Sequence, residues 1–113
     1  MLAQRLRTKR LILPFAAVAA AGTNQATAAA MIGNSSVSAA DGTKGVVLPA
    51  PTPGREIRVY NLDAAAGLKV YPHVGGDIND GTQDAAVTIE GKTIATFIAI
   101  DLTTWAAQYT ANT

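Results

Sequence analysis

His73 is the residue of this chain best suited to act as a general base, and it is the only histidine. A nucleophilic mechanism would pair it with a serine and a carboxylate. The three serines, Ser35, Ser36 and Ser38, stand close together in a polar segment well upstream. That segment would have to fold over the domain that carries His73. We therefore interpret His73 as a turn residue after Pro72 and predict no catalytic triad.

The segment Gly76–Gly81 has the oxygen-bearing side chains of a calcium-binding loop. A helix–loop–helix calcium site needs ligands at positions 1, 3 and 5 and a glutamate at position 12. Counting from Asp77, position 5 is Gly81 and position 12 is Thr88, so the spacing fails. Aspartate, asparagine and glycine are also the usual residues of tight turns. We predict a turn, with a loose cation site as the alternative.

Three aspartates, Asp77, Asp80 and Asp84, have the residue type that glycoside hydrolysis uses as acid and base. That chemistry also needs a cleft lined with aromatic side chains. The aromatic residues of this part of the chain are Tyr60, Tyr71, Phe97, Trp105 and Tyr109. Those on strands are expected in the core or at a subunit interface. Gly75-Gly76 lacks the lysine of a phosphate-binding loop. We expect no enzyme and no cofactor.

The first residues read like an export signal. Four basic residues precede an apolar run from Leu11 to Ala21, and Ala26-Thr27-Ala28 resembles a cleavage site. The alternatives are an arm that is retained and ordered against a partner, and a signal peptide left uncleaved. We expect the retained arm. The run has eleven residues, whereas a membrane span needs about twenty, so we predict no membrane span.

The charges are distributed unevenly along the chain. Residues before Asp41 include four basic and no acidic side chains, and the rest includes five basic and eight acidic ones, giving +4 and −3. A basic arm on an acidic domain suggests an acidic partner surface, which could be nucleic acid, anionic lipid or protein. The alternative is that the four charges only keep an apolar terminus soluble. No aromatic residue is interleaved among the basic ones, so we expect no recognition of nucleic acid sequence. The residues predicted to bind the partner are Arg5, Arg7, Lys9, Arg10, Leu11, Ile12, Leu13 and Phe15.

Three regions follow from composition: an apolar and basic arm (1–33), a linker rich in Pro, Gly and Ser (34–54), and a β domain (55–113). Alanine predicts a short helix over Ala16–Ala21. A short strand is predicted at Val46–Leu48. The break near residue 34 predicts that the domain folds without residues 2–33.

The β domain is predicted from alternating apolar residues at 55–61, 68–71, 87–89 and 93–101, with a last segment at 105–109. In the strand 93–101 both faces are mostly apolar, which predicts burial on both sides. The fold class is therefore all-β, a small antiparallel sandwich or barrel preceded by an extended N-terminal arm. Residues expected in the core or an oligomer interface are Ile94, Phe97, Ile98, Ile100 and Trp105.

The chain has 113 residues and no cysteine, so disulfides cannot stabilise it. A β domain of about 60 residues buries only about 60% of its unfolded surface. Domains with so small a core usually gain the missing stability by forming oligomers. We therefore predict an oligomer.

The domain resembles small virion proteins of tailed bacteriophages, which decorate or cement the capsid or belong to head fibres. The resemblance covers about residues 45–105 and rests on Val59-Tyr60-Asn61, Leu68–Pro72, Gly75–Asn79, Thr96–Ile98 and Thr104-Trp105. It implies a β-rich knob, often a homotrimer, on the outer surface of the capsid, without catalysis. The signal-like arm is not part of the resemblance.

Together, these expectations predict a structural virion protein on the outer surface of the capsid. Its arm is expected to bind the major capsid protein. One alternative is a fibre or receptor-binding module, which would need exposed aromatic residues on a distal loop. Another is an exported bacterial β domain whose signal peptide remained uncleaved. A mature chain starting near Ala28 would identify that last case.

Overall fold

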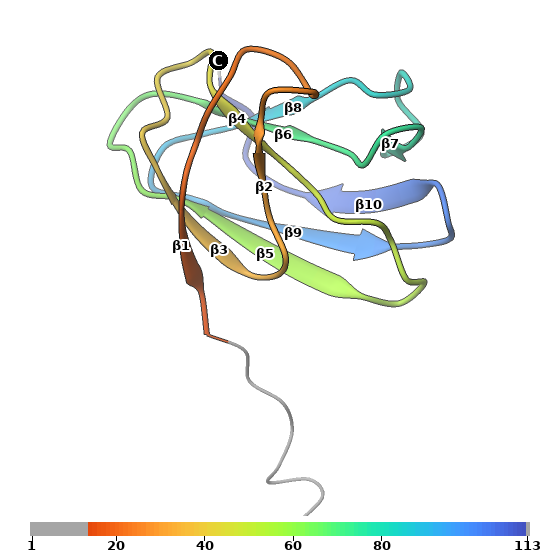
Figure 1. Cartoon of the computed structure of the whole chain (residues 1–113). Helices are drawn as coiled ribbons and strands as arrows, with labels where there is room; N and C mark the ends of the chain where they lie inside the picture. The colour runs from red at the N-terminus through yellow and green to blue at the C-terminus, as the bar shows by residue number, and fades with distance from the viewer. Residues whose placement is uncertain (1–13, 113) are drawn as a thin grey trace, which may run out of the picture.

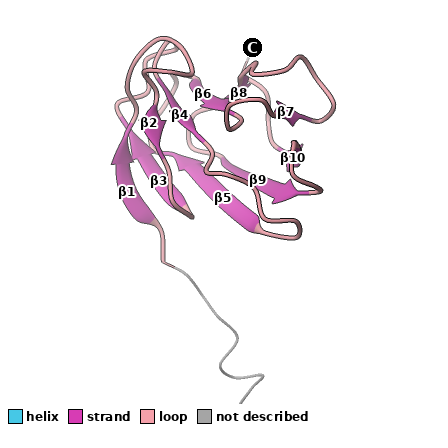
Figure 2. Cartoon of the chain, turned by 45° about the vertical axis from the view of Figure 1, so that its right-hand side comes forward, coloured by secondary structure: helices cyan, strands magenta, loops and turns pink. Residues whose placement is uncertain are grey.

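A computed structural model describes residues 14–112, and within these bounds the chain forms two β-sheets and no helix (Figures 1 and 2). The prediction of an all-β fold is confirmed. The strands are β1 (Ala16–Ala19), β2 (Ala29–Ala30), β3 (Ser35–Ser38), β4 (Gly45–Val47), β5 (Glu56–Asn61), β6 (Leu68–Tyr71), β7 (Asp77–Ile78), β8 (Val87–Ile89), β9 (Ile94–Ala99) and β10 (Thr104–Gln108). The strands predicted at 55–61, 68–71, 87–89 and 93–101 correspond to β5, β6, β8 and β9.

The strands are divided between a six-stranded and a four-stranded sheet. The larger sheet, called sheet A here, has the order β1-β3-β5-β9-β10-β7, and sheet B has the order β2-β4-β6-β8. The two sheets form two layers, with sheet A below sheet B in Figure 1. Buried side chains from both sheets form one core cluster, which lies between the layers.

The expectation of an antiparallel fold is wrong, because both sheets are mixed. β1, β3 and β5 run parallel in sheet A, and β2, β4 and β6 run parallel in sheet B. The chain path alternates between the sheets from β1 to β9, so successive strands of one sheet are not joined by hairpins and parallel pairing is possible. The connection through the other sheet does not by itself fix the direction, because β6 and β8 are joined in this way and pair antiparallel.

The helix predicted over Ala16–Ala21 is also wrong. Ala16–Ala19 is strand β1, which pairs in parallel with β3 and places Val18 opposite Val37. Alanine favours a helix in isolation, but a segment of four to six residues is too short to form one in water. Pairing with a sheet edge supplies the backbone hydrogen bonds instead, including Ala20 N to Ser38 O at 2.8 Å.

The predicted boundaries at residues 33 and 54 do not separate the described residues into units. Segment 14–33 contributes β1 and β2, and segment 34–54 contributes β3 and β4. Ala20 and Met31 are buried in the same core cluster as Phe97. Cleavage after Ala28 would remove β1 from sheet A.

The core explains which face of each strand is apolar. In β9, Ala95, Phe97 and Ala99 are buried, while Ile94 and Ile98 are exposed. Within one copy of the chain, burial on both faces of this strand is therefore not found. Of the residues predicted for a core or interface, Phe97 and Trp105 belong to the core, and the three isoleucines are exposed.

The folding of residues 14–33 with the rest leads to a prediction about truncation. Deleting residues 2–13 keeps every strand that the structure describes and should leave a cooperative unfolding transition. Deleting residues 2–33 removes β1, β2 and buried Met31. Truncating one buried methionine to alanine costs about 2–5 kcal/mol, so the loss of two strands should abolish folding. This replaces the expectation that the domain folds without residues 2–33.

Thermal melts followed by circular dichroism measure both truncations. The fold described above predicts a cooperative transition for the shorter deletion and none for the longer one. A cooperative transition at an unchanged temperature after deletion of residues 2–33 would contradict it.

Candidate functional site: an apolar sheet face

The outer face of sheet A carries a row of mostly apolar side chains across four strands. The strand register aligns Ala17, Ser36, Tyr60 and Ile94 on β1, β3, β5 and β9. Because side chains alternate along a strand, these residues point away from the core, which receives their neighbours such as Val37 and Val59. The row is therefore available to a partner.

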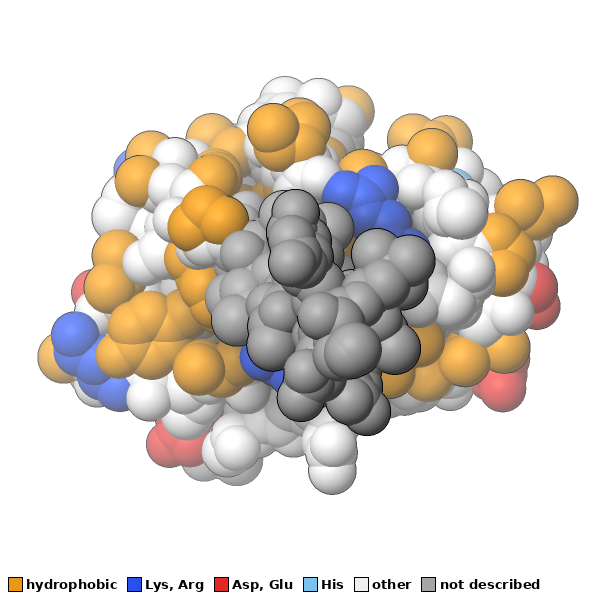
Figure 3. Space-filling model, turned by 90° about the horizontal axis from the view of Figure 1, so that it is seen from below, with side chains coloured by type: hydrophobic (Ala, Val, Ile, Leu, Met, Phe, Trp, Pro, Cys, Tyr) orange, Lys and Arg blue, Asp and Glu red, His pale blue; other side chains and the backbone are white. Residues whose placement is uncertain are grey.

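Phe15, Ser36, Tyr60 and Ile94 line a shallow groove of about 190 Å³ on this face. Phe15 comes directly before β1 and is 39% exposed, and Ile94 begins β9 and is 55% exposed. Viewed from below, apolar side chains are numerous on this side of the domain, interspersed with basic and other polar groups (Figure 3). We call this groove the sheet A groove.

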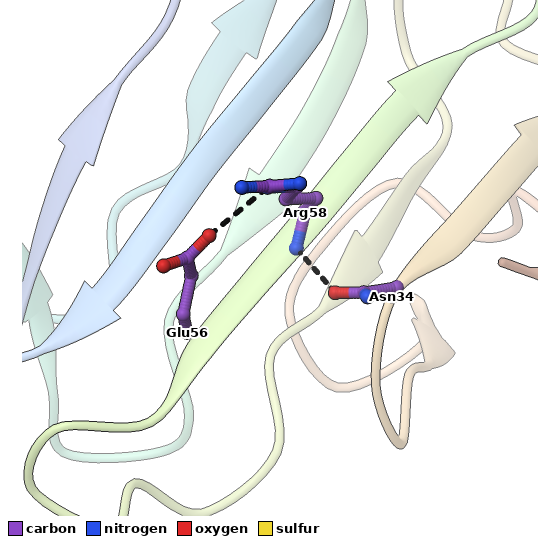
Figure 4. Close-up of polar contacts among 3 residues, drawn as sticks. All are labelled: Asn34, Glu56 and Arg58. Atoms are coloured by element: carbon purple, nitrogen blue, oxygen red, sulfur yellow. Dashed lines mark hydrogen bonds and ion pairs between the residues drawn. The ribbon is translucent and has the colours of Figure 1, made fainter. Parts of the chain in front are cut away.

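Polar contacts fix the strands that carry the groove. Arg58 N on β5 donates a hydrogen bond to Asn34 Oδ1 at 2.8 Å. Arg58 Nε also pairs with Glu56 Oε2 at 2.9 Å, so the two charges neutralise each other beside the groove (Figure 4). An exposed pair contributes only about 0–1 kcal/mol.

Only one of the eight residues predicted to bind the partner lies within the described structure. Phe15 lies in the sheet A groove. The seven others, Arg5, Arg7, Lys9, Arg10, Leu11, Ile12 and Leu13, lie outside the described residues. Tyr60 and Ser36 were not predicted as surface residues, although the alternation of Ile57 and Val59 already implied that Tyr60 faces outward.

The residues considered for chemistry are placed apart from one another. His73 Nδ1 accepts a hydrogen bond from Trp105 Nε1 at 3.2 Å, and Ser36 lies on β3, separated from β10 by β5 and β9. Ser35 is buried, and its hydroxyl donates to Gly33 O at 2.8 Å. Neither serine is positioned to use His73 as a base.

The aspartates of the 75–84 loop have separate partners. Asp84 Oδ1 accepts hydrogen bonds from Gly75 N at 2.7 Å and Gln25 Nε2 at 3.1 Å. Asp77 Oδ1 accepts one from Thr104 Oγ1 at 3.0 Å, whereas its Oδ2 is buried without a partner. Among residues 14–112, no three His, Cys, Asp or Glu residues gather as a metal site. Asp84 therefore links its loop to Gly75, and Asp77 links β7 to β10.

Three other aspartates hold turns between strands, and each has a lowered pKa. The pKa of Asp41 falls from 3.8 to about 2, chiefly because Thr43 N donates to its carboxylate at 2.9 Å. Hydrogen bonds from Ala66 N and Ala65 N lower the pKa of Asp63, and bonds from Thr103 N and Thr104 N lower that of Asp101. Each bond favours the charged form of the carboxyl group.

The turn at Asp41 predicts a specific pH dependence. Because its pKa is lower in the folded state, its contribution to stability is full above about pH 3.8 and is lost as the pH falls through about 2. Asp41→Asn removes this titration. The difference in unfolding free energy between wild type and variant should therefore shrink over that interval. Urea unfolding at a series of pH values measures it.

Glu90→Gln is the matched control, because Glu90 is exposed and its carboxylate forms no hydrogen bond with the described residues. The control should leave the acid-induced loss of stability as in wild type. An Asp41→Asn curve that stays parallel to the wild-type curve down to pH 2 would contradict the assignment.

Comparison with protein family models, with curated proteins and with solved structures gave no match. No helix within residues 14–112 is long and apolar enough to cross a membrane. The interpretation of function therefore depends on the sequence pattern and on the sheet A face.

Proposed function

We propose that this protein is a structural component of a tailed-phage virion that decorates or cements the outer surface of the capsid. Its N-terminal residues and the adjoining face of sheet A would contact the major capsid protein. The observation that carries the proposal is the exposure of Phe15, Ile94 and Ile98 on one sheet face, at the point where the basic and apolar N-terminal residues join the domain.

The charge distribution supports the same orientation. Four of the nine basic residues precede the described structure, and no acidic residue accompanies them, whereas the chain from Asp41 onward carries a net charge of −3. An arm of this sign is attracted to an acidic surface, and it directs the face beside Phe15 toward that surface. The opposite side of the domain then points into solvent.

A homotrimer fits this role. Ile94, Ile98 and Ile100 are exposed on and directly after β9, and covering them would extend a small core. Three arms on one particle bind cooperatively, because the first contact raises the effective concentration of the others. A fibre or receptor-binding module is less well supported, since Tyr71 and Trp105 are buried and no described aromatic residue stands exposed on a loop far from Phe15.

Co-sedimentation with tailed-phage heads tests the proposal. The full chain should pellet with intact heads that lack it, saturate at a number of copies set by the capsid lattice, and remain in the supernatant without heads. Binding to tail fibres or to host cells in place of heads would contradict the proposal.

A further inference from the structure

The sheet A groove is large enough to hold aliphatic side chains from another segment. It has a volume of about 190 Å³ and is lined by Phe15, Tyr60, Ile94 and the small Ser36. For comparison, an apolar cavity of about 150 Å³ holds a molecule the size of benzene. One or two leucine or isoleucine side chains therefore match the groove.

The chain has a segment of that chemistry beside the groove. Residues 1–13 lie outside the described structure, and they join it at Pro14, next to Phe15. The last three of these residues are Leu11, Ile12 and Leu13. In water, both this apolar segment and the groove gain free energy when they are covered.

We propose that, in the free protein, the groove of each copy holds Leu11–Leu13 of a neighbouring copy. Proline restricts the residue before it to extended conformations, so Pro14 opposes a sharp reversal at Leu13. A segment that continues extended from Pro14 would carry Leu11–Leu13 away from Phe15 by about 3.3 Å per residue. A neighbouring copy has no such constraint.

The edge of sheet A provides a second point of attachment. β1 is an end strand, paired on one side only, with β3. Ala16 N and Ala20 N bond to β3, so the backbone groups of Ala17 and Ala19 face the open edge. This edge has no charged residue and no proline within the strand, which are the usual protections against strand addition. Backbone groups of the neighbouring copy next to Leu11–Leu13 can pair with this edge, while Leu11–Leu13 themselves fill the groove.

Cysteine pairing tests the inference on the purified full-length chain, which has no cysteine of its own. A Leu13→Cys variant is mixed with a Ser36→Cys variant, allowed to exchange copies, and oxidised. The matched control is Ser38→Cys, which is on the same strand and face but is not among the residues that line the groove. The Leu13→Cys and Ser36→Cys mixture should give several-fold more covalent dimer on a non-reducing gel than the mixture with Ser38→Cys.

Equal yields with the two serine positions, or no covalent dimer with either, would overturn the proposal. The double variant Leu13→Cys/Ser36→Cys separates the two possible sources of the segment. Closure within one chain at high dilution would show that each groove holds its own segment, and would overturn exchange between copies.

A charge in the groove provides an independent test. Ile94→Lys should reduce the cross-linking yield several-fold, whereas Val74→Lys, at an exposed valine in the β6–β7 loop, should leave it unchanged. An unchanged yield with Ile94→Lys would also overturn the proposal. These assays contain no capsid, so their failure is distinct from a failure of co-sedimentation with phage heads.

Discussion

Replacing Trp105 with alanine is expected to lower the free energy of unfolding by about 3–5 kcal/mol. The side chain is fully buried in the core cluster, which also contains side chains from sheet B. Its Nε1 also donates a hydrogen bond to His73 Nδ1 at 3.2 Å. Small domains are stable by only about 5–15 kcal/mol, so this single change removes a large part of the total.

Urea unfolding of full-length variants measures this effect. Trp105→Phe should lower the free energy of unfolding clearly less than Trp105→Ala, because phenylalanine keeps most of the apolar volume. Some cost should remain, because the hydrogen bond to His73 is lost. Ile100→Ala, at a residue that is 57% exposed, is the control for an apolar truncation outside the core. A cost below 1 kcal/mol for Trp105→Ala would mean that the two sheets do not close over this side chain.

Replacing Leu11, Leu13 and Phe15 with serine is expected to reduce capsid binding more than a hundredfold. Burial of each side chain contributes about 1.5–3 kcal/mol, and each 1.4 kcal/mol is about a tenfold change in affinity. The expected loss is therefore large even if only part of each side chain is buried. Co-sedimentation with phage heads over a range of protein concentrations measures the affinity.

The charge variant is the matched comparison. Replacing Arg5, Arg7, Lys9 and Arg10 with glutamine should weaken binding modestly and reduce its dependence on salt, because exposed ion pairs contribute only about 0–1 kcal/mol each. If this variant binds more weakly than the serine variant, the arm engages nucleic acid or lipid instead of a protein surface. The proposed cementing role would then be wrong.

Much of the fold could be predicted from alternation along the chain. β5 places apolar residues on every second position, and the pattern itself requires one buried face. β9 is apolar on both faces, so its pattern indicated a strand but not which face the core covers. β1 could not be predicted in this way, because a run of alanine carries no alternation and alanine favours a helix locally. Its pairing with β3 depends on a neighbour that only the tertiary fold provides.

The mixed topology could not be predicted from the sequence for a similar reason. A strand pattern predicts which residues face the core, but it is the same for parallel and antiparallel partners. The alternation of β1 to β9 between the two sheets is a property of the loops and of the whole chain path. Local residues such as Gly22, with a φ of 68°, permit the reversals but do not select the partner strand.

The sequence predicted single residues of the groove but not the groove itself. Phe15 was assigned to an arm and Ile94 to an interface, each from its apolar character. Their proximity follows from the register of four strands, which aligns Ser36 with Tyr60 and Tyr60 with Ile94. Such a surface exists only once the strand order is known.

Cryo-electron microscopy of purified tailed-phage virions that contain this chain tests the central claim most directly. Our account predicts density for the two-sheet domain at symmetry-related positions on the outer surface of the head, with the sheet A face and Phe15 toward the major capsid protein. Density at a fibre tip, or heads without such density, would contradict the assignment to capsid decoration.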